Sequence, residues 1–444
     1  MKSVLPSEAI TLLSALEYAG YESYVVGGCV RDFLMGKIPH DIDITTSATP
    51  DQMKRVFYNN RVIETGIQHG TLSVQSGEKW FEITTFRTDG IYEDHRHPKS
   101  VTFTNKIKDD LSRRDFTVNA MAYHPNVGFV DYFGGKEDIA ARRIRAVGSP
   151  RARFNEDGLR ILRGLRFASV LGFSIEQETA DAIHDLRDLL KNISNERVYE
   201  EMTRLLCGND ADRVLREYVD VFGVVLPELL TTVGFEQNNH FHIYDVFEHT
   251  LLALKASSPD PIVRWAVLLH DLGKPATHTR DENGDHFKGH AQRGVELARE
   301  ILTRLRADRQ TIRRVAFLVE YHDTNVFGDE KSIKMLLGKC THDDAYRLLQ
   351  LQRADSASHA PSAQNRFGDF FELEKRLTAV IEKNPCVTRE QLALSGEDVI
   401  ALGVARGKSV GKALSRLLDA VLEEQCENTR EELADYLTRY LSDL

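Results

Sequence analysis

Sequence patterns typical of β-strands end near residue 140, and from residue 155 onward the apolar residues are mostly spaced as in helices. Before that point, turn residues separate five short β-rich runs: Tyr24–Val26, Asp41–Thr45, Thr71–Val74, Phe81–Phe86 and Val101–Phe103. Helices are expected at 7–19, with Ser7 as N-cap and Gly20 as the stop, and at 50–57. The pattern predicts an α/β head followed by a long all-α remainder, without internal repeats.

Composition narrows the class of protein. With 444 residues, 42% of them apolar and 28% charged, the chain is expected to form about two to four globular domains. Collagen-like, low-complexity and disordered chains are excluded. The five cysteines form no C-x-x-C pair, which argues against a zinc knuckle or a disulfide framework. With no signal-like N-terminus and no apolar run of membrane length, a cytoplasmic protein is expected.

The net charge of −10 argues at first against a nucleic-acid partner. The local distribution reverses this expectation. Residues 142–166 hold eight arginines against two acids, Glu156 and Asp157, for a net charge of +6. The sequence therefore predicts a basic strip in an otherwise acidic chain, and weak non-specific binding to RNA at large.

Residues 27–45 read G-G-C-V-R-D-F-L-M-G-K-I-P-H-D-I-D-I-T. Gly28, in the pair that follows a β-run, allows a phosphate to approach backbone N–H groups, and Arg31 adds a charged donor. Asp41 and Asp43 flank one residue at the start of a strand, so both carboxylates point to one face. Mg²⁺ is the usual ion that neutralises such a pair when phosphate is the substrate.

This stretch resembles the signature of the class II tRNA nucleotidyltransferases and bacterial poly(A) polymerases. Four further segments resemble the later motifs of that family in the same order: R-R-D-F-T-V-N-A-M-A at 113–122, D-Y-F-G-G-K-E-D-I at 131–139, E-D-G-L-R-I-L-R-G-L-R-F-A at 156–168 and E-R-V-Y-E-E at 196–201. The resemblance spans about 27 to 206. It implies a polymerase-β-like nucleotidyltransferase head.

The resemblance implies a domain order as well. A catalytic head is expected at 1–145, a nucleotide-selecting helical neck at 146–215, an HD-like helical body at 216–375 and a tRNA-binding tail at 376–444. The implied activity is that of a CCA tRNA nucleotidyltransferase. It adds and repairs the 3′-terminal CCA of tRNA from CTP and ATP, without a nucleic-acid template.

The same resemblance implies the site residues. Asp41 and Asp43 would be the catalytic carboxylates and would hold two Mg²⁺ ions. The nucleotide would be bound by one glycine, one acid and five arginines: Gly28, Arg31, Arg114, Asp157, Arg160, Arg163 and Arg166. Glu82 stands where a third carboxylate could support the metals, or equally where a strand turns a polar side chain outward; the sequence leaves these alternatives open.

Asp157 and Arg160 suggest how bases are chosen. They are three residues apart in a helical run, so they are expected on one helix face. An Asp accepts and an Arg donates hydrogen bonds. Cytosine and adenine each present an amino donor beside a ring-nitrogen acceptor, whereas guanine and uracil present the reverse pattern. The pair therefore favours C and A.

Two segments resemble the tRNA branch of the family, T-G-I-Q-H-G-T-L-S-V at 65–74 and D-G-I-Y-E-D-H-R-H-P-K-S-V at 89–101. In the family, the second is a loop that addition of the terminal A requires, so full CCA addition is favoured. His97 departs from the arginine that family members often carry. A partial enzyme that adds only A or only CC stays the alternative.

A second constellation is rich in histidine. His249, the adjacent pair His270–Asp271 and Asp355 follow each other in the order of the HD phosphohydrolase superfamily, which they resemble. Imidazole and carboxylate can jointly bind a divalent transition metal, and His290 and His322 could add a second one. In the tRNA family, active HD domains resemble phosphatases or 2′,3′-cyclic phosphodiesterases. The alternative is a structural helical domain with capping histidines.

The segment G-V-A-R-G-K-S at 403–409 nearly matches a phosphate-binding loop but has three residues between its glycines instead of four. It is interpreted as a turn between helices, within a region that resembles the family's tRNA-contacting tail. Expected partners are the tRNA 3′ end, CTP and ATP, with no membrane and no protein partner. Two other classes stay as alternatives: an HD phosphohydrolase with an inactive head, and a non-catalytic RNA-binding module.

Overall fold

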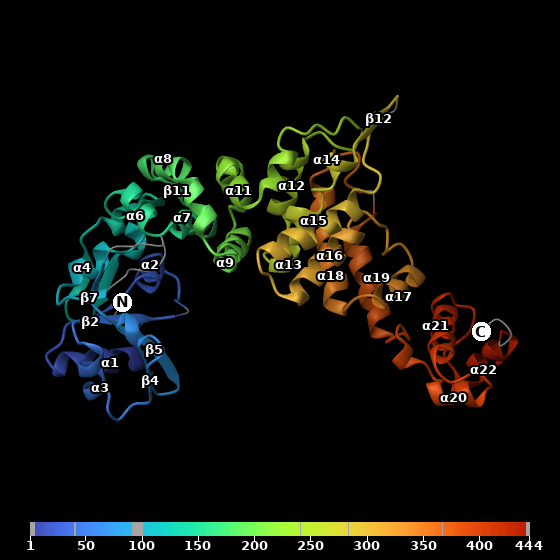
Figure 1. Ribbon diagram of the computed structural model, residues 1–444, viewed down its shortest axis with the longest axis horizontal. Helices are drawn as coiled ribbons and strands as arrows, with labels where there is room; N and C mark the ends of the chain where they lie inside the picture. The colour runs from blue at the N-terminus through green and yellow to red at the C-terminus, as the bar shows by residue number, and fades with distance from the viewer. Residues whose placement is uncertain are drawn as a thin grey trace. The chain divides into compact units, whose positions relative to one another are not determined.

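The computed structural model describes residues 5–39, 41–90, 101–239, 241–282, 284–365 and 367–440 (Figure 1). The chain divides into two compact units, 1–230 and 231–444. The first unit combines a sheet with helices, and the second is mostly helical. This confirms the predicted fold class of an α/β head followed by helical segments.

The first unit is built on a seven-stranded mixed sheet. Its strand order is β3-β4-β5-β2-β1-β8-β9, antiparallel except for the parallel pair β2/β5. The strands are β1 (Ser23–Val26), β2 (Asp43–Thr46), β3 (Val62–Ile63), β4 (Thr71–Ser76), β5 (Lys79–Thr85), β8 (Met121–His124) and β9 (Gly128–Asp131). Two smaller pairs are β6 (Arg87–Asp89) with β7 (Val101–Phe103), and β10 (Arg143–Ile144) with β11 (Ser174–Ile175).

Each of the five predicted strands is present, with boundaries shifted by up to two residues. Strand β4 buries every second side chain, which is why its pattern was readable from sequence. Strands β8 and β9 were not predicted. All four residues of β8 are buried, so no polar–apolar alternation marks it. Residues 91–100, which include most of the 89–101 segment and His97, lie outside the described residues.

Helix α1 (Ser7–Tyr18) follows the predicted apolar spacing and buries four residues in the core beneath the sheet: Ala9, Leu12, Leu13 and Leu16. Gly20 ends the helix with a φ of 85°. The predicted cap is wrong, because Pro6 occupies the N-cap position and Ser7 is already helical. Helix α3 (Pro50–Val56) confirms the helix expected at 50–57 and begins with a capping box from Thr49 to Gln52.

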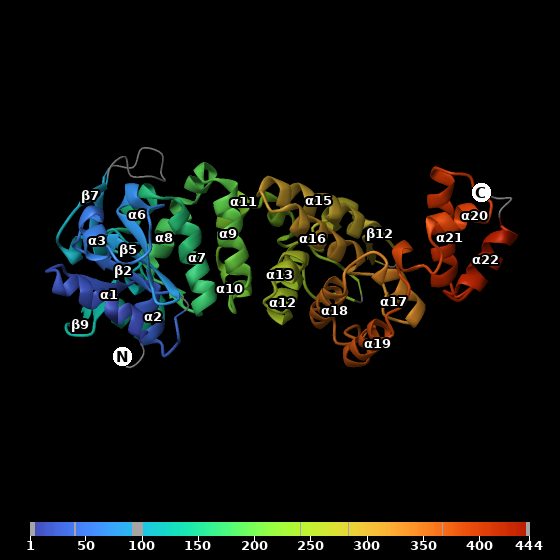
Figure 2. The ribbon, with the colours of Figure 1, turned by 90° about the horizontal axis from the view of Figure 1, so that it is seen from below.

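The other helices of the first unit surround the sheet or extend the chain beyond it. They are α2 (Gly28–Leu34), α4 (Ile107–Ser112), α5 (Gly135–Ala140), α6 (Pro150–Glu156), α7 (Leu159–Leu171), α8 (Gln177–Asp185), α9 (Asn195–Leu206), α10 (Ala211–Glu217) and α11 (Val219–Val225). Helices α7 and α9 pack side by side (Figure 2). Their pairing brings the 156–168 and 196–201 segments together.

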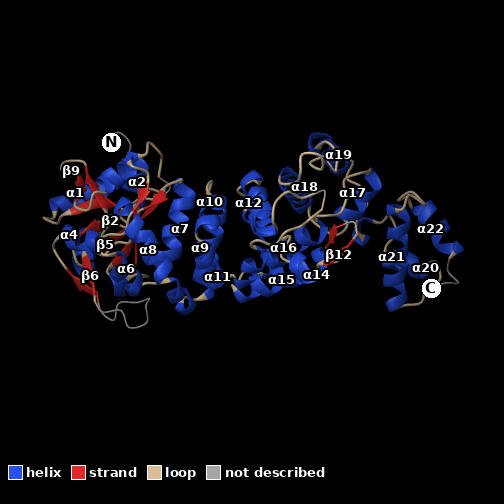
Figure 3. Ribbon diagram, turned by 90° about the horizontal axis from the view of Figure 1, so that it is seen from above, coloured by secondary structure: helices blue, strands red, loops and turns tan. Residues whose placement is uncertain are grey.

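The second unit consists of α12 (Val246–Ala256), α13 (Pro261–Leu269), α14 (Lys274–Thr277), α15 (His290–Arg304), α16 (Arg309–Tyr321), α17 (Glu330–Leu337), α18 (His342–Ala357), α19 (Phe370–Glu382), α20 (Gly396–Ala401), α21 (Lys408–Leu422) and α22 (Arg430–Arg439). Helix α18 packs against both α12 and α13. A hairpin of β12 (Thr279–Asp281) and β13 (Gly284–His286) interrupts the helices (Figure 3). The expectation of an entirely α-helical remainder is therefore wrong at this hairpin and at β11.

Among the described residues, no helix combines the length and the apolar character that a membrane crossing would require. Residues 403–407 lie in the connection between α20 and α21, with Gly403 and Gly407 at positive φ, and Lys408 and Ser409 begin α21. This agrees with their interpretation as a turn between helices.

Candidate active site and candidate metal centre

The predicted glycine turn lies between β1 and α2. Gly27 has a φ of 79°, a conformation that other residues rarely adopt. A Cβ at this position would lie 3.0 Å from the Arg114 Nη1 atom. Glycine here therefore lets the backbone and the guanidinium approach each other closely. It also opens the turn toward the pocket described below.

Three carboxylates gather at the start of β2. The parallel register pairs Ile44 with Ile83, so the preceding residues, Asp43 and Glu82, stand beside each other on neighbouring strands. Burial raises the pKa of Asp43, the charges of Glu82 and Asp41 raise it further, and Arg114 opposes them. The structure thus places Glu82, which the sequence left open, beside the predicted pair. Oxygen ligands that repel one another in this way fit a hard divalent cation.

Next to these carboxylates lies a pocket of about 440 Å³. Its lining includes Asp43 and all seven residues predicted to bind the nucleotide: Gly28, Arg31, Arg114, Asp157, Arg160, Arg163 and Arg166. Asp41 is not among its lining residues. The pocket also contains Gly27 of the predicted glycine turn, and residues that sequence reasoning did not single out: Arg113, Asp115, Asn119, Leu159, Phe167 and Arg197. Positive charge dominates this lining.

Acidic partners hold several of these arginines in place. The Arg163 Nε atom donates to Asp115 Oδ2 at 2.8 Å, and Arg166 Nε lies 2.6 Å from Glu201 Oε2. Burial would raise the pKa of Asp115, but Arg163 outweighs it and lowers that pKa to about 2. Arg31 Nη1 donates to Asn119 Oδ1 at 2.8 Å. The guanidiniums are therefore oriented without a ligand.

A single aromatic ring supports three of the arginines. The guanidinium carbon of Arg166 lies 4.1 Å from the Phe167 ring centroid, and those of Arg31 and Arg163 lie 5.5 Å from it. Cation–π attraction at these distances favours the charged groups at the ring face. Phe167 is itself buried and packs edge-on against Phe116. Phe167 directly follows Arg166, and this adjacency was the only sequence signal for its role. Nothing else in the sequence distinguished Phe167 from a core residue.

Asp157 and Arg160 both line the pocket, but the structure corrects how they are related. Asp157 has an extended backbone between α6 and α7, so the two residues do not share a helix face. The Asp157 carboxylate accepts from Arg197 Nη2 at 2.9 Å and from the Leu159 backbone N–H at 3.0 Å. Arg160 donates to Glu156 at 2.6 Å and to two backbone carbonyls, which leaves two of its guanidinium N–H groups without these partners.

The basic strip at 142–166 is more neutralised than its sequence suggests. Arg143 and Arg145 both pair with the buried Asp138. Arg151 pairs with Asp185. Other arginines of the strip pair with the acids described above. Most of the strip therefore stabilises the fold or shapes the pocket, and little of it is a free basic surface.

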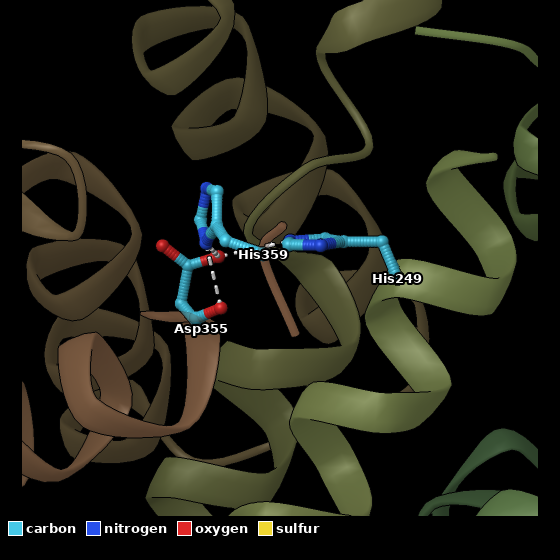
Figure 4. Close-up of side chains that lie close together, drawn as sticks. All are labelled: His249, Asp355 and His359. Atoms are coloured by element: carbon cyan, nitrogen blue, oxygen red, sulfur yellow. Dashed lines mark hydrogen bonds and ion pairs between the residues drawn. The ribbon is translucent and has the colours of Figure 1, made fainter. Parts of the chain in front are cut away.

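In the second unit, the four predicted HD residues come together in the interior. His249 lies on α12, His270 and Asp271 directly follow α13, and Asp355 lies on α18, and all four are buried. The His249 Nε2 atom lies 2.9 Å from Asp355 Oδ1, and His270 Nε2 lies 3.2 Å from Asp271 Oδ2. Figure 4 shows His249 and Asp355 converging with His359, which sequence reasoning did not name.

Backbone carbonyls fix the imidazole orientation. The Nδ1 atoms of His270, His322 and His290 lie 2.7, 2.7 and 2.9 Å from the carbonyl oxygens of the residues three positions earlier. Donation from Nδ1 leaves a lone pair on Nε2, the arrangement typical of metal-binding histidines. His270 Nε2 and both oxygens of Asp271 are buried without a hydrogen-bond partner. Buried polar atoms left unmatched in this way fit a metal ion.

Asp271 connects two groups of ligands. Its Oδ2 atom faces His249 and His270, and its Oδ1 atom lies 3.7 Å from His290 Nε2 and 3.8 Å from His322 Nε2. The described residues therefore form groups that could hold metal ions on both sides of one carboxylate. His290 and His322, which the sequence suggested as possible ligands of a second ion, form one of these groups with Asp271. Lys274 also contacts Asp271, with its Nζ atom 2.6 Å from Oδ2.

This centre opens onto a pocket of about 770 Å³. Asp271, Asp355, His290 and His322 line it, together with Lys274 and three aromatic residues, Phe241, Phe287 and Phe367. A substrate could therefore reach the ligands from one side. His249 and His270 are not lining residues and lie deeper in the protein.

Three domain models match the chain in sequence order. The poly(A) polymerase head domain covers 23–145, the probable RNA- and SrmB-binding site of polymerase A covers 172–231, and the HD domain covers 242–356. The chain belongs to the poly(A) polymerase/tRNA nucleotidyltransferase family. This confirms the resemblance inferred from the five motifs. Members of this family are the relatives described next.

Two curated relatives are CCA-adding enzymes. The protein of Lactobacillus helveticus is 46% identical over 213 residues, which cover 48% of this chain and 53% of the relative. That of Lactobacillus delbrueckii subsp. bulgaricus is 40% identical over 270 residues, which cover 61% of this chain and 65% of the relative. The matches thus span between about half and two thirds of the relatives' lengths.

Solved structures match over nearly the whole chain. The Bacillus stearothermophilus CCA-adding enzyme in complex with CTP has a TM-score of 0.72 and 29% identity, and covers 98% of this chain and 97% of its own. The Thermotoga maritima CCA-adding enzyme complexed with tRNA has a TM-score of 0.58 and 20% identity, and covers 99% of this chain and 97% of its own. At that identity, the second match concerns the fold alone.

Proposed function

We propose that this protein is a CCA tRNA nucleotidyltransferase, which adds and repairs the 3′-terminal CCA of tRNA from CTP and ATP. The observation that carries the proposal is the pocket that joins Asp43 to the predicted base readers and to a set of pre-oriented arginines. The curated relatives are named CCA-adding enzymes, and one matched structure holds CTP. The tRNA 3′ end, CTP and ATP are the proposed partners.

In this proposal, Asp41 and Asp43 hold two Mg²⁺ ions, and Glu82 supports them. Burial raises the pKa of Asp43 and the charges of Glu82 and Asp41 raise it further, so a bound cation would stabilise the ionised carboxylates. Bound Mg²⁺ supplies the positive charge that lowers the barrier to phosphoryl transfer onto a 3′-hydroxyl. The carboxylates would hold the ions at the start of β2, beside the pocket.

The arginines bind and orient the triphosphate. Arg31, Arg114, Arg163 and Arg166 surround one pocket with forked donors suited to phosphate oxygens. Because acids and the Phe167 ring already orient several of them, little side-chain entropy is lost when the nucleotide binds. A triphosphate bound by fixed guanidiniums presents its α-phosphate in a constant position relative to Asp43.

Base choice falls to Asp157 and Arg160. The Asp157 carboxylate retains lone pairs beyond those that accept from Arg197 and Leu159, and Arg160 retains free N–H groups. An acceptor and a donor side by side complement the amino group and ring nitrogen of C and A. Guanine and uracil would place donor against donor and acceptor against acceptor, which leaves polar groups unpaired.

The functional division proposed for the chain is a catalytic head at 1–145, a nucleotide-selecting neck at 146–215, an HD-like body at 216–375 and a tRNA-binding tail at 376–444. The test of the proposal uses tRNAs that lack the tail or end in C or CC, with labelled CTP or ATP. Incorporation of C and then A supports it, and no incorporation contradicts it. Incorporation of A alone onto CC ends, or of C alone, would select a partial enzyme.

We propose a second activity, a metal-dependent phosphohydrolase at the HD centre. Its support is the buried Asp271 carboxylate, whose two oxygens face two groups of oriented imidazoles. His249, His270, Asp271 and Asp355 hold one ion, and imidazole ligands favour a divalent transition metal. Hydrolysis of phosphomonoester or 2′,3′-cyclic phosphate ends, assayed with added divalent metals, tests it. Activity that persists in a His270→Ala/Asp271→Ala variant would contradict it.

A further inference from the structure

Helix α4 carries a carboxylate on its buried face, where an apolar side chain would be expected. The helix buries Ile107, Asp110 and Leu111, which are spaced as one helix face, and the two apolar residues belong to a core cluster with Phe86. Asp110 is 0% exposed. A fully buried acid is rare unless it is paired, so the partners of Asp110 indicate its role.

These partners are two consecutive arginines that line the head pocket. Arg113 donates to Asp110 Oδ1 from Nε at 3.0 Å and from Nη2 at 2.8 Å, and Arg114 Nη2 donates to Oδ2 at 3.4 Å. The Thr45 hydroxyl on β2 lies 3.5 Å from the same Oδ2 atom. Burial would raise the pKa of Asp110, but Arg113 and Arg114 outweigh it and lower that pKa. Asp110 is therefore ionised, and its charge holds both guanidiniums.

Arg114 lies beside both the glycine turn and the head carboxylates. A Cβ at Gly27 would be 3.0 Å from its Nη1 atom, and its charge lowers the pKa of Asp43. Within the part of the chain that the structure describes, the buried Nε atom of Arg114 has no hydrogen-bond partner. A buried N–H group left unmatched is costly, so this atom fits an acceptor such as a phosphate oxygen. Asp110 therefore fixes one nitrogen of a guanidinium that has another donor to offer.

We propose that Asp110 is a positioning residue for nucleotide addition, which holds Arg114 beside Gly27 and Asp43 so that its guanidinium binds the triphosphate. The inference rests on the proposed function, in which CTP and ATP are the substrates. Arg113 supplies the second positive charge that keeps the buried carboxylate ionised. An arginine that is fixed before the ligand arrives loses little side-chain entropy on binding. Asp110 is not among the described residues that line the pocket, so it acts on the nucleotide through Arg114.

The test compares the wild-type chain with Asp110→Asn, which keeps the shape of the side chain but removes its charge. Binding of CTP is measured by isothermal titration calorimetry with Mg²⁺ and without tRNA, and KM and kcat are measured for CTP and ATP on tRNA. The Kd and the KM should rise by roughly tenfold to a hundredfold, the effect of one charged hydrogen bond. The kcat should change little, because the triphosphate already carries its charge in the ground state. A wild-type Kd in a folded Asp110→Asn protein overturns the proposal.

A double-mutant cycle tests whether Asp110 acts through Arg114. Arg114→Ala should itself raise the Kd for CTP, and in that background Asp110→Asn should raise it further by no more than about twofold. A purely structural role would weaken CTP binding by the same factor in both backgrounds. Equal factors therefore overturn the proposal.

Two variants control for the loss of a buried charge and for a destabilised head. Asp344→Asn removes a buried carboxylate of the second unit that also pairs with two arginines, Arg314 and Arg347, at nitrogen–oxygen distances of 3.3 and 3.0 Å. Leu16→Ala creates a cavity in the core of the head. Both should lower the urea midpoint of unfolding and keep the wild-type Kd for CTP. If either raises that Kd as much as Asp110→Asn does, the effect is general destabilisation and the proposal fails.

Asp110→Glu serves if Asp110→Asn does not fold, because it keeps the negative charge that neutralises the two arginines. Its longer side chain displaces Arg114 from its place beside Gly27. The Kd for CTP should therefore rise by about threefold to tenfold, less than in Asp110→Asn. A wild-type Kd in Asp110→Glu would show that the position of the carboxylate is unimportant and would overturn the proposal.

Binding without tRNA separates this proposal from the proposed function. A wild-type protein that binds CTP but adds no nucleotide to tRNA would contradict the proposed function, and the Kd values would still decide on Asp110. A wild-type protein that binds neither CTP nor ATP would overturn both.

Discussion

The head pocket and the HD centre both gather charged side chains, but the two sites differ in whether those side chains already have partners. In the head, the arginines are held by acids such as Asp115 and Glu201 before any ligand is present. In the HD centre, the Asp271 oxygens and the His270 Nε2 atom are buried without hydrogen-bond partners. A site for a large anion benefits from pre-oriented cations, whereas a site for a metal keeps lone pairs available.

The comparison predicts that the two sites can be inactivated independently, and the head carboxylate should show the largest effect. Asp43→Asn should lower nucleotide addition by about 1,000-fold or more, because metal charge stabilisation is worth several kcal/mol. Metal content of the HD centre should be unchanged. Asp188→Asn, in an exposed ion pair with Lys191, is the control. Addition within about tenfold of wild type would show that Asp43 does not hold the catalytic ions.

The next largest effect is expected at the HD centre. His270→Ala should abolish binding of at least one transition-metal ion, measured by elemental analysis, and lower phosphohydrolase activity by at least about 100-fold, because the change removes a proposed ligand. Nucleotide addition should be retained. His184→Ala, in the first unit, is the imidazole control. A His270→Ala protein with wild-type metal content would contradict the assignment of this centre.

A smaller effect is expected on the selection of the base. Asp157→Ala should relax discrimination between CTP and UTP by roughly tenfold to a hundredfold, the effect of about 1 to 3 kcal/mol from one unmatched buried polar contact. Asp185→Ala removes the partner of an exposed arginine instead and should leave base choice unchanged. The measurement is kcat/KM for each nucleotide on the same tRNA. If the preference for C and A survives in Asp157→Ala, another group reads the base.

The smallest effect concerns acid stability of the head. The pKa of Asp115 is lowered to about 2 in the folded protein, so the unfolded chain binds the extra proton first as the pH falls. Ionised Asp115 contributes about 2 kcal/mol to the free energy of unfolding. This contribution is complete above the ordinary Asp pKa and is lost as the pH falls from about 4 to 2. Asp115→Asn should therefore flatten the pH dependence of urea unfolding in this range. An unchanged dependence would contradict the ion pair.

Local sequence patterns were enough to predict several elements of this fold. The alternation in β4 and the apolar spacing of α1 made those elements predictable, and the family motifs anticipated the seven predicted nucleotide-binding residues that line the head pocket. Contacts between residues far apart in the sequence could not be predicted from local patterns. Glu82 is identified only when the β2/β5 register places it beside Asp43, and Arg197 only when α9 packs against α7.

Asp157 shows why residue spacing alone misleads. Its separation from Arg160 suggested a shared helix face, yet the chain breaks between α6 and α7 at this residue. The break turns the carboxylate toward Arg197 while Arg160 remains on α7. Similarly, a local charge count could not show that Asp138 and Asp185 neutralise arginines of the 142–166 strip, because these acids lie outside it in sequence.

We propose that the head pocket builds CCA without a nucleic-acid template. The most direct measurement incubates tRNA lacking its last three nucleotides with CTP, ATP and Mg²⁺, and sequences the extended 3′ ends. The predicted product is C, C and A in that order, with GTP and UTP not incorporated, and with no extension by Asp43→Asn. Unextended tRNA, extension by A alone, or incorporation of all four nucleotides alike would contradict the claim.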